Sequence, residues 1–194
     1  MCIRDSSITG DPFNDFWYCV GVIGFSEEFI KLIPWVVFAI FSRKIKEPYD
    51  YILYACASAL GFAFTENLYY LEESHNISGR SVLSTVGHMF DATLVAYGLI
   101  LAKYRCHQIW KKIGVILLFF FLSCLSHGFY DYLLISPAQK GKLFITIIFF
   151  LLSLHFWMFM MNNAMNNSSF YDFKSVNIRY PKNCLLYTSD AADE

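Results

Sequence analysis

The chain has 194 residues, of which 56% are hydrophobic, 19% are aromatic and only 16% are charged, with a formal net charge of -1. A typical soluble domain is roughly 45–50% apolar and about 25% charged. This composition argues against a soluble enzyme, a disordered tail and a nucleic-acid-binding module, and no nucleic-acid partner is expected.

Both ends of the chain resemble translated sequencing adapter. Residues 1–6 spell MCIRDS and residues 184–194 spell CLLYTSDAADE, and both strings look like the transposase end sequence used in library preparation. Genuine polar termini are the alternative, but such scars are left out of fold reasoning. The expected protein is one domain over 7–183, with 177 residues, a net charge of +2 and four cysteines. It is expected to be a fragment of a larger helical bundle.

Five stretches of the chain are long and apolar enough to cross a membrane. A spanning helix needs about 20 mostly apolar residues, and charged or turn-forming residues separate the five stretches. The expected fold class is therefore all-α, a polytopic transmembrane helical bundle with about five spans. The predicted spans are 15–42, 50–71, 81–102, 113–135 and 143–164.

The charges between the spans predict their orientation. The 43–48 and 103–112 loops together carry seven Lys or Arg residues, whereas the two alternate loops carry three. Because cytoplasmic loops are enriched in Lys and Arg, residue 7 is expected outside and the C-terminal tail in the cytoplasm. The protein is accordingly predicted to be an integral membrane protein in contact with the lipid bilayer.

Several ionisable residues lie inside the predicted spans. Each costs at least about 2.5–3.5 kcal/mol at the centre of a span on the insertion scale. Counted from the predicted outer ends, acids and histidines on four spans fall within roughly one to two helical turns of one another. This convergence predicts a polar layer in the outer half of the bilayer. The residues are Glu27, Glu28, Lys31, Glu66, His88, Asp91, His127 and Asp131.

The spacing of these residues predicts which of them share a helix face. Lys31 follows Glu27 by four residues and Glu28 by three, so its ammonium can lie against both acids. Asp131 follows His127 by four residues and can orient the imidazole. Any one such residue alone is as well explained by a polar contact between helices, and for His155 that is the favoured interpretation. Small residues at 61 and 63 are expected where a neighbouring helix approaches closely.

The ordered motifs resemble those of the PrsW family of intramembrane proteases, which is distantly similar to the CAAX-processing and bacteriocin-processing (CPBP) membrane peptidases. Glu27-Glu28-Phe-Ile-Lys31 resembles E-E-x-x-K, and the segment 61–70 resembles G-F-A-x-x-E-N-x-x-Y with Glu66 and Asn67 in the acid and amide positions. Gly87-His88 resembles the third motif, and 127–131 resembles H-x-x-x-N. Asp131 departs from this last motif, because Asn is common at that position.

The resemblance implies endoproteolysis of membrane-anchored proteins, such as anti-sigma factors, in a bacterial cell membrane. Peptide hydrolysis needs an activated water and a stabilised oxyanion. The predicted catalytic residues are Glu27 or Glu28 as general base, with His88 and His127 holding the water or the oxyanion. Supporting roles are assigned to four further residues, namely Lys31, Glu66, Asn67 and Asp131.

The predicted hydrolysis could be zinc-dependent or metal-free. His88, His127 and Glu28 are the expected ligands if zinc is used, in a three-ligand site with an open position. No H-E-x-x-H motif is present, and metal-free glutamate chemistry is slightly favoured. The alternatives to a protease are a transporter or proton relay, which would need a polar path through the whole bilayer, and a non-catalytic binding or scaffold protein.

Overall fold

The computed structural model describes residues 7–41, 45–73, 78–139 and 142–168. The predictions for the two terminal segments, 1–6 and 184–194, and for the basic C-terminal tail fall outside these residues.

Within the described part of the chain, every regular element is a helix, as predicted for an all-α bundle. The first predicted span is one uninterrupted run of helix, in which a π-helical segment separates two α-helical segments. Four long α-helices follow it, and a short 3₁₀ turn, η2 (Pro137–Gln139), precedes the last. The elements are α1 (Pro12–Tyr18), η1 (Cys19–Gly24), α2 (Phe25–Phe41), α3 (Pro48–Glu73), α4 (Ser78–Tyr104), α5 (Ile109–Ile135) and α6 (Leu143–Asn166).

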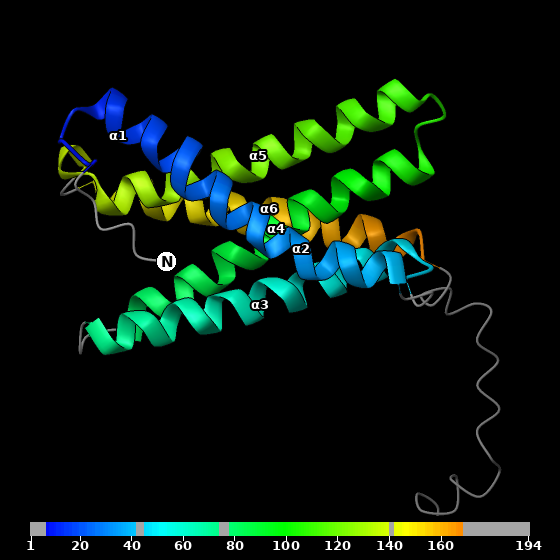
Figure 1. Cartoon of the computed structure of the whole chain (residues 1–194), viewed down its shortest axis with the longest axis horizontal. Helices are drawn as coiled ribbons and strands as arrows, with labels where there is room; N and C mark the ends of the chain where they lie inside the picture. The colour runs from blue at the N-terminus through cyan, green and yellow to red at the C-terminus, as the bar shows by residue number, and fades with distance from the viewer. Residues whose placement is uncertain (1–6, 42–44, 74–77, 140–141, 169–194) are drawn as a thin grey trace, which may run out of the picture.

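The helices lie side by side and alternate in direction (Figure 1). The end of α2, the start of α3 and the connection from α4 to α5 lie at one end of the bundle, on the right of the view. The start of α1 and the connection from α5 to α6 lie at the opposite end. The two connections with most of the basic residues therefore share one end of the bundle, as the loop charges predicted.

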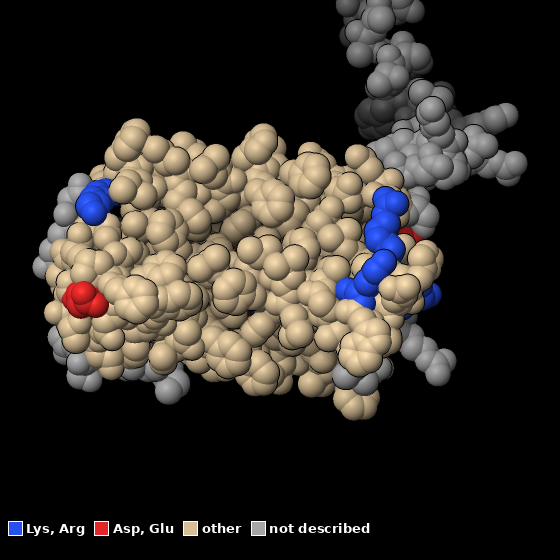
Figure 2. Space-filling view, turned by 90° about the horizontal axis from the view of Figure 1, so that it is seen from above, with Lys and Arg blue, Asp and Glu red and all other residues tan. Residues whose placement is uncertain are grey.

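Five spans were predicted, and three helical segments among the described residues have the length and hydropathy of a membrane span, namely Ser81–Tyr104, Ile109–Ile135 and Leu143–Asn166. The outer faces of α5 and α6 expose leucines such as Leu117 and Leu151. Figure 2 shows one face of the molecule on which charged side chains gather at the two ends and leave the middle without charge. An apolar band between polar ends is the surface that a protein presents to a bilayer.

The half of the bundle near the α2–α3 connection has an apolar core. Trp35, Ile52, Ala96 and Ile100 are buried there, and Met160 of α6 is fully buried among them. Burial of such side chains removes their apolar surface from the surroundings and packs the helices at close to crystal density. The polar residues inside the spans lie on the other side of this core, nearer the α5–α6 connection.

The start of the first helix is fixed by polar contacts. Asp11 caps α1 by accepting a 2.8 Å hydrogen bond from the Asn14 backbone N–H, and Pro12 follows it at a position that proline favours. The fully buried Asp15 carboxylate accepts hydrogen bonds from the Thr9 N–H at 2.9 Å and from Ser136 Oγ at 2.7 Å. Asp15 therefore ties the first helix to the segment that follows α5.

Two glycines let the first helix approach α5 closely. A Cβ atom at Gly24 would lie 2.6 Å from the Cys124 carbonyl oxygen, and one at Gly128 would lie 2.6 Å from the Cys19 carbonyl oxygen. The close approach expected at positions 61 and 63 was wrong at Gly61, where a Cβ meets nothing within 4 Å, whereas Ala63 is buried. The backbones of η1 and α5 thus meet where small residues allow them to approach.

Replacing Gly128 by Ala should destabilise the fold by about 1–3 kcal/mol, because the added methyl group meets backbone atoms that cannot move aside. Gly114→Ala is the matched control on the same helix, since its Cβ meets nothing within 4 Å. Alanine there should be neutral or stabilise by up to about 1 kcal/mol through its higher helix propensity. Thermal unfolding in detergent micelles, followed by circular dichroism, measures both. Equal effects of the two substitutions would contradict the close packing of η1 on α5.

Candidate active site

Four helices bring acids and histidines into one cluster. Glu66, His88 and His127 lie about two to three helical turns from the ends of α3, α4 and α5 that face the α5–α6 connection. Glu27 and Glu28 join them from the first turn of α2. The rings of His88 and His127 are 5.1 Å apart between centroids. The acids and histidines that were predicted to share one layer, from their distances to the span ends, thus lie together in the structure.

Glu28 is the most enclosed acid of the cluster, with 2% of its surface exposed. One of its oxygens forms an ion pair with Lys31 and accepts a 2.7 Å hydrogen bond from His127 Nδ1. Its other oxygen accepts a 2.8 Å hydrogen bond from Ser123 Oγ. Since both oxygens have donors, Glu28 fixes the orientation of its neighbours and offers no free oxygen to a substrate.

The Lys31 ammonium lies between the two histidines. Its Nζ atom is 3.0 Å from His88 Nδ1 and 3.4 Å from His127 Nδ1. An ammonium can only donate, so His88 Nδ1 accepts and the ring proton of His88 is on Nε2. That nitrogen donates to Glu66 Oε2 at 2.7 Å. Each imidazole is therefore oriented by a carboxylate, Glu66 for His88 and Glu28 for His127.

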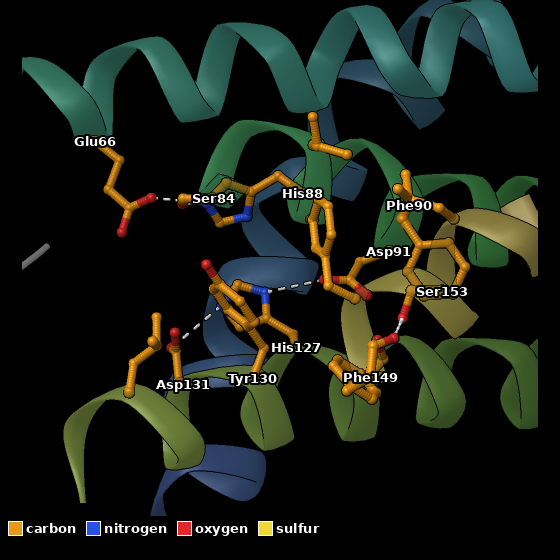
Figure 3. Close-up of a pocket in the computed structure, with 16 residues that line it drawn as sticks. Glu66, Ser84, His88, Phe90, Asp91, His127, Tyr130, Asp131, Phe149 and Ser153 are labelled. Carbon is orange, nitrogen blue, oxygen red and sulfur yellow. Dashed lines mark hydrogen bonds and ion pairs between the residues drawn. The ribbon is translucent and has the colours of Figure 1, made fainter. Parts of the chain in front are cut away.

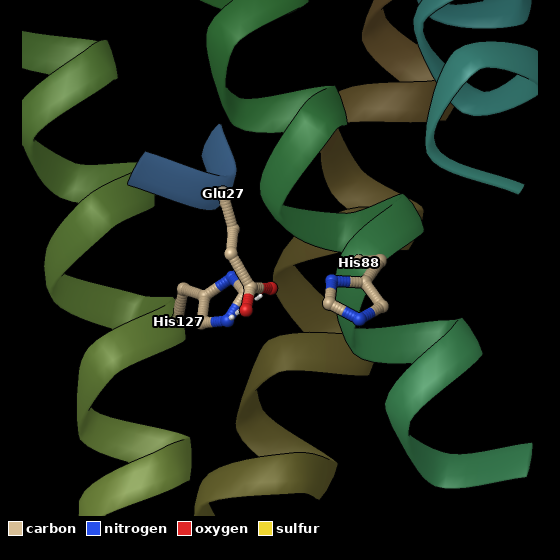
Figure 4. A group of neighbouring side chains, drawn as sticks. All are labelled: Glu27, His88 and His127. Carbon is tan, nitrogen blue, oxygen red and sulfur yellow. Dashed lines mark ion pairs between the residues drawn. The ribbon is translucent and has the colours of Figure 1, made fainter. Parts of the chain in front are cut away.

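Glu27 differs from Glu28 in having an uncommitted oxygen. Its Oε2 atom is buried, lies 3.4 Å from His127 Nε2 and accepts no hydrogen bond from any described residue. Figure 4 shows the Glu27 carboxylate between the imidazoles of His127 and His88. A buried carboxylate oxygen without a donor costs free energy, so this position calls for a water, a metal ion or a substrate group.

A small cavity reaches this cluster. It has a volume of about 30 Å³, enough for roughly two water molecules. In Figure 3, Glu66 and Asp131 lie on one side of the cavity, Phe90, Phe149 and Ser153 lie on the other, and the histidines lie between them. The cavity therefore joins a polar wall to an apolar one.

Two sets of side chains in the described residues have atoms close enough together to hold a metal ion. One is Glu27 with His88 and His127, and the other is Glu28 with Asp91 and His127. The zinc ligands predicted from the sequence were instead the two histidines with Glu28. The Glu28 oxygens already have donors, whereas Glu27 Oε2 has none, so the first set is the better candidate. In that set His88 would bind an ion through Nδ1, which now accepts from Lys31, because its Nε2 donates to Glu66.

The first set fits the chemistry of zinc. Two imidazoles and one carboxylate form a known catalytic ligand set for this ion, and the unpartnered Glu27 oxygen faces the two imidazoles. The cluster holds the carboxyl groups of Glu27, Glu28, Glu66, Asp91 and Asp131, and Lys31 lies among them. Buried carboxylates need compensating positive charge, which a divalent cation would supply.

Two serines that the sequence analysis missed belong to the cluster. Ser123 lies four residues before His127 and donates to Glu28. Ser84 lies four residues before His88, and its Oγ atom is 3.2 Å from His88 Nε2. The signal was available, because residues four apart share a helix face.

The remaining predicted residues differ in how close they lie to the cluster. Asp131 Oδ2 is 3.4 Å from His127 Nε2, in reach of the imidazole it was expected to orient. Asn67 Nδ2 donates to Thr85 Oγ1 at 3.2 Å, and Asn67 is not among the residues lining the cavity. His155 is exposed on α6, so the expected contact between helices was wrong.

The sequence of this chain is similar to those of known proteins. A sequence model of the PrsW family intramembrane metalloproteases matches residues 3–161, most of the chain. The chain belongs to this family. No solved structure matches it.

Curated relatives named Protease PrsW come from several bacteria. The relative from Geobacillus kaustophilus is 31% identical over 121 residues, which cover 59% of this chain and 51% of that protein. The relative from Shouchella clausii is 34% identical over 116 residues, covering 58% and 52%. That from Halalkalibacterium halodurans is 31% identical over 130 residues, covering 66% and 59%. The chain thus spans about half the length of the curated relatives it matches, and like them it is a membrane protein.

The candidate metal site predicts zinc binding that depends on both histidines. His88→Ala and His127→Ala should each abolish high-affinity zinc binding by the purified chain, and Glu66→Ala should weaken it by about 10–100-fold because the imidazole loses its orienting partner. Isothermal titration calorimetry in detergent micelles measures the affinity. His155→Ala, outside the cluster, is the control and should change nothing. Unaltered zinc affinity in His127→Ala would exclude this site.

The buried Glu28–Lys31 pair predicts a specific pattern of stability. Lys31→Met leaves the Glu28 carboxylate without its cation and should cost about 3–5 kcal/mol. Adding Glu28→Gln to Lys31→Met should recover part of that loss, because the uncompensated charge is gone. Lys103→Met is the control at an exposed lysine and should cost less than about 1 kcal/mol. Thermal unfolding measures all four proteins. A double variant no more stable than Lys31→Met would contradict the charge argument.

Proposed function

We propose that the chain carries the active site of a membrane-embedded endopeptidase that cuts membrane-anchored proteins. The observation that supports this most directly is the Glu27 oxygen. It is buried, accepts no hydrogen bond from the described residues and faces two imidazoles that are each held by another carboxylate. A carboxylate with a free oxygen beside oriented histidines can serve as a general base or as a metal ligand in the hydrolysis of a peptide bond.

Glu27, His88 and His127 are the residues that would hold a zinc ion. When bound, the ion would polarise the scissile carbonyl and supply a nucleophilic water at neutral pH. The remaining roles belong to the chain. Glu66 and Glu28 keep the imidazoles in a fixed orientation, because each accepts a hydrogen bond from one of them.

Asp131 is the carboxylate we assign to proton transfer. It lines the cavity, and its Oδ2 atom is 3.4 Å from His127 Nε2. A general base must lie within reach of the water that it deprotonates, and Asp131 shares a cavity of water size with His88 and His127. If the reaction proceeds without metal, Glu27 takes this role, because its free oxygen lies 3.4 Å from His127 Nε2.

The substrate is proposed to be a membrane-anchored protein, such as an anti-sigma factor, reached within the lipid bilayer. The proposed location is the bacterial cell membrane. The end of the bundle that holds the α4–α5 connection is assigned to the cytoplasm, because the connections there have most of the loop Lys and Arg residues. The active site then lies in the outer half of the bilayer.

A proton relay or transporter is disfavoured by the one-sided distribution of polar groups. Such a protein needs ionisable residues along a path through the whole membrane. Among the described residues, the half of the bundle between the site and the basic connections is filled by the apolar core around Trp35, Ile52 and Ile100. A protease needs access from one side only.

Expression of the chain in a bacterial membrane should create new protein termini that mass spectrometry can map. His127→Ala and Glu27→Gln should each reduce these cleavages at least 100-fold, because they remove an oriented imidazole or the free carboxylate. Equal protein levels and equal thermal unfolding temperatures serve as the controls for correct folding of the variants. The His155→Ala variant should cleave normally.

Two outcomes would count against this proposal. Identical termini from the unaltered chain and from His127→Ala would exclude endoproteolysis at this site. Cleavage by purified chain that survives exhaustive chelation, with no metal left by elemental analysis, would exclude the zinc role and leave Glu27 as the base.

A further inference from the structure

A second, larger cavity lies beside the catalytic one. Its volume is about 570 Å³, within the size range of ligand pockets. Its walls are almost wholly apolar and come from α1, α4, α5 and α6. They include Phe16, Leu94, Leu122, Leu125, Phe129 and Leu152.

The two cavities share a wall. Phe90, Ser126, Phe149 and Ser153 line both of them. In Figure 3 the labelled members of this shared wall lie on the side of the histidines away from Glu66 and Asp131. A chain that entered the large cavity would therefore meet the catalytic histidines where the cavity ends.

The large cavity also opens to the outer face of the bundle. Leu152 lines it and is 65% exposed, and Phe156 lines it and is 41% exposed. Both lie on α6, one of the helices apolar enough to cross a membrane. Entry is thus from the membrane side of the bundle.

The volume limits what can enter. A helix about 10–12 Å across would fill 570 Å³ in roughly one turn. A whole transmembrane helix does not fit, but the side chains of a few residues do. A helix must also be opened locally before its peptide bonds can be attacked, because its backbone groups are all paired within it.

We propose that this apolar cavity binds a short stretch of large apolar side chains of the membrane-embedded substrate, next to the bond that is cut. The cavity is thus the pocket that selects the residues on one side of the cleavage site. This proposal rests on the proposed protease function. Continuity with the catalytic cavity favours the substrate over a lipid chain or another segment of the protein as the occupant.

The test compares neighbouring substitutions on α6. Leu152→Trp should fill the cavity, whereas Leu151→Trp is the matched control, because Leu151 is 58% exposed and does not line it. New termini in the bacterial membrane are mapped for each variant. Leu152→Trp should reduce cleavage next to large apolar residues at least tenfold relative to cleavage next to Ala or Gly, and Leu151→Trp should match the unaltered chain.

A second pair of variants enlarges the cavity. Phe156→Ala should shift cleavage toward larger side chains, while Phe159→Ala, outside the cavity, should not. Cleavage preferences that are the same in Leu152→Trp and the unaltered chain would overturn this inference and leave the protease function standing. The same shift in Leu151→Trp would also overturn it. No new termini from the unaltered chain would contradict the proposed function and with it this inference.

Discussion

The compensation of buried charge organises this bundle. Glu28 is enclosed among helices, where a charge without a partner would cost several kcal/mol, and its two oxygens are satisfied by Lys31, Ser123 and His127. These partners come from α2 and α5, and Lys31 extends the network to His88 on α4. The contacts that compensate the buried charge of Glu28 therefore also hold both histidines in place.

This network depends on a close approach of the first helix to α5. Gly24 and Gly128 allow the backbones of η1 and α5 to meet, and the contact lies within one turn of Glu28 and next to His127. A π-helical segment covers the same stretch, and such segments are frequent at functional sites. Packing and chemistry are thus coupled at one point of the bundle.

The adjacent acids Glu27 and Glu28 serve different purposes because consecutive helix residues point in different directions. Glu28 points into the charge network, whereas Glu27 keeps an oxygen free beside the imidazoles. The polar cavity lined by His88 and His127 shares a wall with an apolar one that opens on the outer face of the bundle. This arrangement places a cavity of water size next to an apolar cavity, which is the basis of the proposed substrate binding.

The sequence alone determined the helical bundle and the layer of acids and histidines, because span length and helical rise depend only on local order along the chain. Spacing of three or four residues also predicted that Lys31 meets Glu28 and that Asp131 reaches His127. Rotation of one helix against another is not encoded in such spacing. Only the tertiary structure therefore showed that Glu27 has a free oxygen and Glu28 does not. It also showed that the close backbone contact is at Gly24 and Gly128 and not at Gly61, and that an apolar cavity lies beside the site.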